Sequence, residues 1–384
     1  MNVAASANPS TPSREFVRNV KTVVIKVGSA VLTDMNGLDR DMVASLSRQI
    51  AMLGKSGVRV VLVSSGAIAA GAGKMPGHAN ARTIPEKQAL AAIGQSSLMQ
   101  AYEESFQKFG LHVAQILITR QGLIPRNRYI NAKNTVITLM EWGVIPVINE
   151  NDTVAVEELQ FTDNDALAVL MVNLAEADLL ICLSDTDGLY DGDPGERKGA
   201  RIVREVARVD SAVFAMAGKS PGRAGRGGMR SKLESARMAT ACGIPMIIAG
   251  GRTPDVIGRI FAGEETGTLF HPSENRRING RKAWIALALE REGSLLIDDG
   301  AVEAIVRRGK SLLPAGLRRV EGTFDAGACV MCRDSAGEDV ALGIANYSAD
   351  DLRKLAGCKC SDMSDILGCN GRAEVIHRDN MVIL

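Results

Sequence analysis

Short apolar segments alternate with longer segments of helical character between residues 20 and 270. The segments with the character of buried strands are KTVVIKV, RVVLV, HVAQILIT, VIPVIN, DLLICL and IPMIIAGG. Between them lie segments that we predict to be helical: DMVASLSRQIAMLG, NRYINAKNTVITLMEWG, DALAVLMVNLAEA and SKLESARMATACG. The small-residue turn SSGAIAAGAG is also predicted to lead into a helix. This alternation predicts an α/β fold, an open and mainly parallel sheet with helices on both faces. In such sheets ligands bind at the carboxyl ends of the strands.

The alternation stops near residue 270, and the rest of the chain has a different character. Residues 271–284 are polar and charged, and beyond them come short apolar runs separated by turn signals, which predict a small β-rich domain. We predict five regions, listed here: a disordered tail over 1–16, a catalytic domain over 17–270, a linker over 271–282, a β-rich barrel domain over 283–371 and a C-terminal tail over 372–384.

Charge and cysteine content restrict the classes of function. The net charge is +1 and 46% of the residues are hydrophobic, so there is no overall field that would suggest a nucleic-acid or membrane partner. We find no run of roughly 18 apolar residues that could span a membrane and no apolar core in a leader. Seven cysteines, an odd number, suit a reducing cytoplasm.

Five of the cysteines, Cys329, Cys332, Cys358, Cys360 and Cys369, gather near the C-terminus. Zinc binding is one interpretation, but Cys329 and Cys332 lie three apart in a predicted strand, which puts them on opposite faces. The second pair has the spacing Cys-x-Cys, which zinc ribbons do not use. We therefore expect buried or partly exposed thiols and no protein-held metal.

Polar residues follow the predicted strands where ligands are expected. They are Lys26 with Gly28 and Ser29, Ser64 to Gly66, Asn149 to Asp152, Asp163 to Asp165, Ser184 with Asp185 and Asp187, and the segment GRGGMRSK up to Lys232. A lysine at the end of an apolar strand is costly unless it reaches solvent or meets an anion. Two lysines and two glycine-rich turns together favour a polyphosphate, because small residues let backbone N–H groups approach its oxygens. The sequence patterns of P-loops, dinucleotide-binding folds and protein kinases are missing.

The acidic and amide residues of these loops suggest a second ligand. Each one taken alone could cap a helix or form an ordinary turn. Together, their oxygens can accept hydrogen bonds from an ammonium group, while Ser65 and Gly66 can donate to a carboxylate. The set therefore predicts a pocket for a small zwitterion such as an amino acid. None of the four histidines lies in these loops, and a carboxylate nucleophile, already ionised at neutral pH, needs no general base.

Six segments in order resemble the amino acid kinase family: VVIKVGSAVLT, VVLVSSGAIAAG, IPVINENDTVAVEEL, FTDNDALA, LLICLSDTDGLYDGDP and GRGGMRSK. The segments RRGKSLLPAGLRRVEGTF and LGIANYS resemble the PUA domain. Within the kinase family, the resemblance implies a member that uses ATP and Mg²⁺ to phosphorylate the γ-carboxylate of L-glutamate, which is the first step of proline biosynthesis.

The resemblance also implies roles for single residues. Lys26 and Lys232 would stabilise the transferring phosphoryl group, and Asp165 would orient them. Glutamate would be bound by Ser65, Asp152 and Asn164, with Asp163 close by. ATP would be bound by Lys26, Gly28, Ser184, Asp185 and the segment Arg226, Gly227, Gly228, Met229, Arg230, Ser231 and Lys232. The last loop of the family often reads Thr-Gly-Gly-Met-x-Thr-Lys, whereas this chain has Arg226, Arg230 and Ser231 there, and Ser184 replaces a commoner threonine. The two arginines either tighten nucleotide binding or face solvent.

Two alternatives remain open at this point. Another family member could act on acetylglutamate, aspartate or UMP, although the acidic loops favour a substrate with a free amino group. The chain could instead bind RNA through its PUA domain, but residues 281–384 carry 16 acidic and 14 basic side chains, and phosphate-binding domains are usually basic. RNA is therefore not expected as a partner. The resemblance further implies a homo-oligomer, either dimer or tetramer, and a reductase that consumes glutamyl phosphate.

Overall fold

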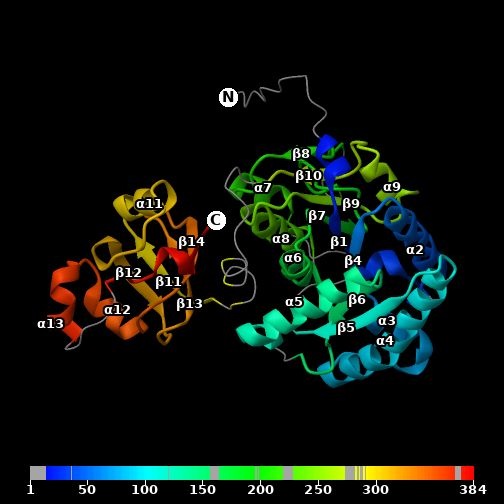
Figure 1. Cartoon of the computed structure of the whole chain (residues 1–384), viewed down its shortest axis with the longest axis horizontal. Helices are drawn as coiled ribbons and strands as arrows, with labels where there is room; N and C mark the ends of the chain where they lie inside the picture. Colours follow the sequence, from blue (N-terminus) through cyan, green and yellow to red (C-terminus); the bar gives the residue numbers. More distant parts are fainter. Residues whose placement is uncertain are drawn as a thin grey trace.

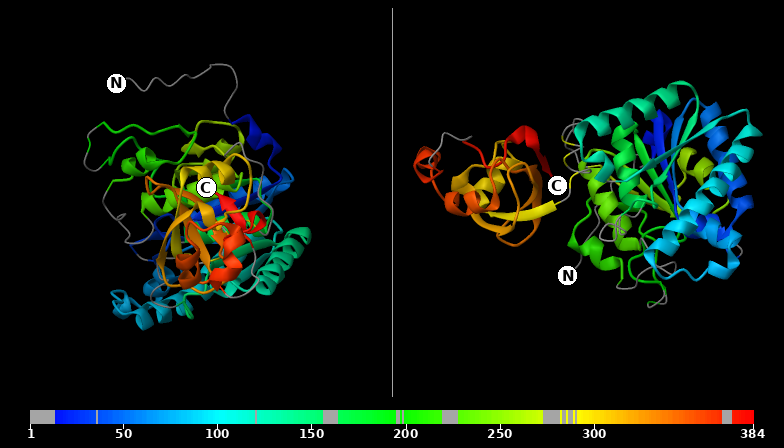
Figure 2. Two further views of the ribbon diagram at one scale, coloured as in Figure 1. Left: turned by 90° about the vertical axis from the view of Figure 1, so that its left-hand side faces the viewer. Right: turned by 90° about the horizontal axis from the view of Figure 1, so that it is seen from below.

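The computed structural model describes residues 14–35, 37–119, 121–155, 164–194, 197, 199–218, 228–272, 282, 285, 289, 291–367 and 373–384. Two units are visible, each built on one sheet (Figures 1 and 2). Within the described residues, no helix is both long enough and apolar enough to cross a membrane.

The first unit is built on an eight-stranded sheet with the order β5-β6-β4-β1-β7-β9-β10-β8. The strands are β1 (Thr22–Val27), β4 (Arg59–Ser64), β5 (Val113–Ile118), β6 (Ile145–Glu150), β7 (Leu179–Ser184), β8 (Glu205–Val206), β9 (Met246–Gly250) and β10 (Thr268–Phe270), and a separate hairpin joins β2 (Thr33–Asp34) to β3 (Gly37–Leu38). Six strands from β5 to β9 run parallel, whereas β10 is antiparallel to β9. The predicted open, mainly parallel sheet is confirmed.

Helices cover both faces of this sheet (Figure 1). They are α1 (Ser29–Leu32), α2 (Arg40–Lys55), α3 (Ala67–Lys74), α4 (Ile84–Gln107), α5 (Arg126–Glu141), α6 (Asn164–Leu174), α7 (Ser211–Met216), α8 (Met229–Ala241) and α9 (Val256–Phe261), with the 3-10 turns η1 (Glu15–Asn19), η2 (Pro76–His78) and η3 (Gln121–Leu123). Strand side chains alternate between two apolar clusters, as the two-residue period requires. Val23 and Ile25 pack with α2, α4 and α9, while Val24 packs with α5, α6 and α8.

The backbones of α3 and α4 are in direct contact where the two helices cross. A Cβ atom added at Gly94 would lie 1.8 Å from the carbonyl oxygen of Ala67, and one added at Gly71 would lie 2.0 Å from that of Leu90. Only glycine fits at either position. The close crossing brings the middle of α4 next to the loop that follows β4, where Gly66 has a φ of +104° and opens α3.

Residues 14–16 belong to the folded unit, although the sequence placed them in a disordered tail. Arg14 is 1% exposed. Its guanidinium donates to the backbone carbonyls of Arg204, Glu264, Thr266 and Gly267. Because a buried guanidinium must satisfy several donors at once, this arginine fixes its own part of the chain, just before η1, against the far edge of the sheet.

The second unit is built on a five-stranded sheet with the order β12-β11-β13-β14-β15. Its elements are β11 (Arg291–Ile297), β12 (Leu317–Gly322), β13 (Cys329–Arg333), β14 (Asp339–Ile344), β15 (Met381–Ile383), α11 (Asp299–Val306), α12 (Ala349–Leu355), α13 (Met363–Leu367), η5 (Pro314–Gly316), η6 (Cys360–Asp362) and η7 (Arg378–Asn380). The sequence assigned 372–384 to a tail, but β15 lies there and pairs with β14. This short apolar strand follows a turn and has too little alternation to be recognised from sequence.

The two faces of β13 belong to different apolar clusters. Val330 and Cys332 pack in the core of the second unit, whereas Cys329 and Met331 share a cluster with side chains of the first unit. The expectation that Cys329 and Cys332 point to opposite faces is therefore confirmed. Both thiols are buried and reduced.

A polar contact also joins the two units. Arg237 of α8 lies 3.4 Å from Asp339 of β14, and Arg333 lies 3.0 Å from the same carboxyl group. The guanidinium of Arg237 is also 5.7 Å from the ring centroid of Phe214, within the range of a cation–π contact. Helix α8 thus contacts the second unit directly.

Candidate active site

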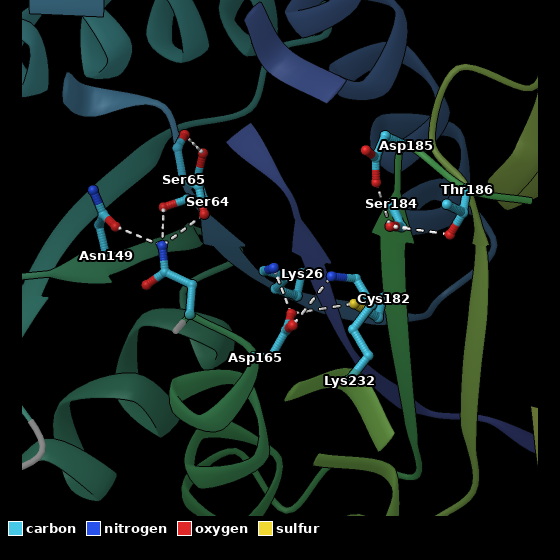
Figure 3. Close-up of polar contacts among 11 residues, drawn as sticks. Lys26, Ser64, Ser65, Asn149, Asp165, Cys182, Ser184, Asp185, Thr186 and Lys232 are labelled. Atoms are coloured by element: carbon cyan, nitrogen blue, oxygen red, sulfur yellow. Dashed lines mark hydrogen bonds and ion pairs between the residues drawn. The ribbon is translucent and has the colours of Figure 1, made fainter. Parts of the chain in front are cut away.

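Lys26 is the penultimate residue of β1, is buried between Ile25 and Val27, and contacts a carboxylate there. The residue is 3% exposed, and its Nζ forms an ion pair with Oδ1 of Asp165, which is 1% exposed. Lys232, 6% exposed, places its Nζ 3.4 Å from Oδ2 of the same aspartate. Two ammonium groups from β1 and α8 therefore meet at one carboxylate from α6 (Figure 3). Such a buried charged group requires pairing, and two cations in one small volume suit a polyphosphate ligand.

Cys182 lies beneath this cluster and was not foreseen as part of the site. Its Sγ donates to Oδ1 of Asp165 at 3.3 Å. Burial is the main cause that raises the pKa of the Cys182 thiol to about 12, and Asp165 adds to the effect. The thiol therefore remains protonated at neutral pH and keeps its hydrogen for the carboxylate. A single cysteine in an apolar strand gives no signal in sequence that would reveal this contact.

A second polar group lies at the ends of β4 and β6. Nδ2 of Asn164 donates to Oγ of Ser65 at 2.7 Å and to Oδ1 of Asn149 at 3.0 Å (Figure 3). Nδ2 of Asn149 in turn donates to Oε1 of Gln95 at 2.9 Å. Ser64 Oγ lies 2.9 Å from the hydroxyl of Tyr102, whose pKa burial raises. These side chains form a buried hydrogen-bonded network, which fixes their positions.

Sequence reasoning placed Ser65 and Asn164 here but missed Gln95. That residue lies in the middle of α4, a helix that the alternation argument did not predict because small and polar residues interrupt the apolar residues of its buried face. The available signal was the start of the helix, where Thr83 and Glu86 form a capping box.

The turn after β6 carries two acidic groups. Asp152, a predicted substrate residue, is half-buried there. Glu150 precedes it at the end of the strand, and burial, with a contribution from Asp152, raises the pKa of Glu150 to about 7. Asp163, the other predicted acidic residue of the pocket, lies outside the described residues.

The predicted nucleotide residues gather at the end of β7 and the start of α8. Ser184 Oγ donates to Oδ1 of Asp185 at 3.0 Å, and the backbone N–H of Gly28 donates to the carbonyl of Leu183 at 3.0 Å. Gly28 therefore lies against the strand that carries Ser184. In Figure 3 the lysines and Asp165 lie between the Ser65 and Asn149 group and the Ser184 and Asp185 group. This order follows that of the strands β6, β4, β1 and β7 in the sheet.

The first turn of α8 carries the rest of the predicted nucleotide segment. Gly228 is its N-cap, and Met229, Arg230 and Ser231 precede Lys232 in the helix. Arg230 is exposed, 5.8 Å from the ring centroid of Phe214 and 3.9 Å from Glu234. Arg226 and Gly227 lie outside the described residues.

A divalent metal would have to be held largely by its ligand at this site. Within the described residues, no three side chains of His, Cys, Asp or Glu gather to hold a metal ion. Magnesium binds oxygen and commonly uses substrate phosphates with one or two carboxylates. The carboxylate of Asp185, beside the hydroxyl of Ser184, fits that mode.

Comparisons with known proteins agree with this geometry. The model of the amino acid kinase family matches residues 21–250, and that of the PUA domain matches residues 293–367. Glutamate 5-kinase from Desulfotalea psychrophila is 47% identical over 97% of this chain and 99% of its own length. Glutamate 5-kinase from Geobacter sulfurreducens is 47% identical over 96% of this chain and 99% of its own length.

A solved structure of UMP kinase from Bacillus anthracis aligns with 68% of this chain and 99% of its own, at 16% identity and a TM-score of 0.47. The family model covers more than half of the chain, and the curated relatives extend the similarity over nearly all of it. The chain belongs to the amino acid kinase family, among the glutamate 5-kinases, and carries a C-terminal PUA domain.

Proposed function

We propose that this protein transfers the γ-phosphoryl group of ATP to the γ-carboxylate of L-glutamate, giving L-glutamyl 5-phosphate for proline biosynthesis. The observation that carries the proposal is the position of Asn164 and Asp165. The first belongs to the amide and hydroxyl group beside Ser65, and the second joins the two buried lysines. The near full-length similarity to glutamate 5-kinases supports the same substrate.

In this reaction a γ-carboxylate oxygen of glutamate attacks the γ-phosphorus, and the bond from that phosphorus to the bridging oxygen breaks as ADP leaves. The nucleophile is already ionised, so the site needs to supply position and positive charge. Lys26 and Lys232 would contact the transferring group, and Asp165 would hold both ammonium groups in place. Magnesium, bound with ATP, would neutralise phosphate charge.

The glutamate pocket would use Ser65, Asp152 and Asn164, with Asp163 near them. Hydroxyl and amide groups can satisfy both ends of an amino acid, and the carboxylate of Asp152 favours its ammonium group. Gly28, Ser184, Asp185 and the segment from Arg226 to Lys232 would bind the nucleotide. We further propose a cytoplasmic homo-oligomer whose labile acyl phosphate passes to a reductase.

RNA binding receives less support from the second unit. The basic residues that suggested it include Arg308, Arg318 and Arg319, and each has a carboxylate partner, at 2.8, 2.8 and 3.6 Å. Paired surface arginines present a weaker positive field to phosphates than unpaired ones.

Trapping of the acyl phosphate with hydroxylamine tests the proposal. The purified chain would be incubated with Mg-ATP and one of L-glutamate, N-acetylglutamate, L-aspartate or UMP. We expect hydroxamate with glutamate alone. Hydroxamate with a different acid would keep the chemistry and reject the substrate, whereas ADP release with UMP and no hydroxamate would reject carboxylate transfer altogether.

A further inference from the structure

Gln95 is a buried polar residue without an assigned role. It is 8% exposed and lies in α4, directly after Gly94. Because a Cβ at Gly94 would overlap the backbone of α3, α4 passes close enough for the next side chain to reach β6. A glutamine in such a position must make hydrogen bonds or lose the energy of its hydration.

The side chain of Gln95 starts a chain of three amides. Its Oε1 accepts from Nδ2 of Asn149 at 2.9 Å. Oδ1 of Asn149 then accepts from Nδ2 of Asn164 at 3.0 Å and from the backbone N–H of Glu150 at 2.9 Å. Nδ2 of Asn164 is held further by Ser65 Oγ at 2.7 Å and the carbonyl of Ser64 at 3.4 Å.

Each of these amides has one donor end and one acceptor end, so the orientation of one determines that of the next. The backbone N–H of Glu150 cannot turn, so the oxygen of Asn149 faces it and Asn164. The nitrogen of Asn149 then faces the oxygen of Gln95, which is its acceptor. The nitrogen of Asn164 then faces Asn149 and Ser65. Its Oδ1 is consequently turned away from the network, and this buried oxygen accepts no hydrogen bond from the described residues.

A buried acceptor without a donor is unfavourable unless a ligand supplies the donor. An ammonium group has three donors and no acceptor, so it matches an exposed amide oxygen and would be repelled by an exposed amide NH₂. The direction of the amide chain therefore decides which chemical group the pocket accepts at this point.

We propose that Gln95 is a positioning residue that, together with the backbone N–H of Glu150, holds Asn149 and through it Asn164 in place, and thereby selects a dicarboxylate substrate that carries a protonated α-amino group. This inference rests on the proposed glutamate kinase activity and deepens it. Gln95 acts through the two asparagines, and its acceptor oxygen is the atom that matters. Without that oxygen, the buried Nδ2 of Asn149 has no acceptor and the amide of Asn149 is displaced. Asn164 then loses the partner that holds its NH₂ group away from the substrate.

Glutarate provides the test, because it is glutamate without the α-amino group and would also give a hydroxamate. The value of kcat/KM would be measured for both substrates with wild-type enzyme, Gln95→Met and Gln95→Glu. Methionine keeps the length of the side chain and removes both polar atoms. Glutamate keeps an acceptor oxygen toward Asn149 and removes the NH₂ group.

We expect Gln95→Met to raise the KM for glutamate about tenfold, the effect of one lost hydrogen bond, with the KM for ATP unchanged. The preference for glutamate over glutarate should fall by a similar factor. Gln95→Glu should keep most of the preference. Retained preference in a folded Gln95→Met variant would overturn the proposal, and so would equal loss in a folded Gln95→Glu variant.

Gln49→Met is the matched control. Gln49 is 5% exposed in α2, and its Oε1 accepts from the backbone N–H of Ile257 at 3.0 Å, far along the chain from the amide network. This variant should lose stability comparably and keep the preference for glutamate. If it loses the preference equally, general destabilisation explains the effect and the proposal fails. Absence of glutamate turnover in the wild-type enzyme would instead reject the proposed function.

Discussion

Asn164 and Asp165 are adjacent at the start of α6, yet their side chains enter two different groups of the site. The amide of Asn164 contacts Ser65 and Asn149, whereas the carboxylate of Asp165 contacts Lys26 and Lys232. One peptide unit therefore sets the separation between the proposed acceptor pocket and the two lysines. A rigid helix start is a suitable place for this, because in-line transfer depends on the distance between its reactants.

Replacement of Lys232 by methionine removes one of the two ammonium groups at Asp165. We expect kcat for glutamyl phosphate formation to fall by about 1,000-fold, because charge stabilisation of the transferring group is lost. Hydroxamate assays and circular dichroism would measure activity and folding. Lys133→Met is the control. Lys133 does not belong to this cluster, and its Nζ lies 2.6 Å from Oε1 of Glu176, with which it forms an ion pair. A Lys232→Met variant with near-normal kcat would refute the assigned role.

The protonated thiol of Cys182 should be protected from alkylation in the folded protein. Burial raises the pKa of this thiol to about 12, and only thiolates react readily with iodoacetamide. At pH 8 we expect no labelling of Cys182 in the native state and full labelling in denaturant, measured by peptide mass spectrometry. The half-buried Cys358 serves as an internal comparison. Rapid native labelling of Cys182 would contradict its position beneath Asp165.

Glu150 should make the stability of the fold depend on pH. Its folded pKa of about 7 lies above the ordinary value of 4.5, so the folded state binds the proton more tightly than the unfolded state does. The stability that this group contributes is therefore fully present below pH 4.5, and it is lost as the pH rises through 7. Glu150→Gln should raise the free energy of unfolding at pH 8 by on the order of 1 kcal/mol, reduced from the full linkage value because the group is only partly buried.

Chemical denaturation of Glu150→Gln at pH 5 and pH 8 would measure this difference. The exposed Glu141, at the end of α5, provides the control Glu141→Gln. An equal gain from Glu150→Gln at both pH values would show that the carboxyl group titrates normally.

Replacement of Gly94 by alanine should separate α3 from α4. Its Cβ would lie 1.8 Å from the carbonyl oxygen of Ala67, and we expect a loss of about 2 to 3 kcal/mol in the free energy of unfolding. Gly54→Ala is the opposite case, because a Cβ at Gly54 in α2 meets nothing within 4 Å. That control should gain about 0.5 to 1 kcal/mol from helix propensity. Similar effects of the two variants in denaturation curves would argue against the close crossing.

The centre of the sheet was predictable because strands such as β1 and β7 are fully buried and consist largely of apolar residues. Val23 to Ile25 and Leu179 to Cys182 show this character directly. The antiparallel β10 was not predictable, since three residues carry no period. Helix α4 was also not predicted, because glycine, alanine, serine and glutamine lie between Leu90, Leu98 and Phe106 on its buried face and interrupt the apolar stripe.

The site was partly predictable for a related reason. Parallel strands bring their carboxyl ends to one edge, so polar residues such as Lys26, Ser65 and Ser184 could be grouped from sequence alone. The ion pair between Lys26 and Asp165 depends on the packing of α6 against the sheet. The hydrogen bond between Gln95 and Asn149 depends on the close crossing of α3 and α4 at Gly71 and Gly94. Both contacts join residues far apart in the sequence, so local sequence patterns do not reveal them.

The contact between the two units has a consequence for protein production. Helix α8 carries Lys232 at its start and Arg237 further along, beside Asp339, and the apolar side chains of Cys329, Met331, Leu342 and Val382 share a cluster with the first unit. A chain that ends before the second unit would leave the opposing apolar surface and Phe214 open to water. Such exposed patches promote self-association. A shortened catalytic fragment should therefore be poorly soluble, and its aggregation could be mistaken for loss of catalytic residues.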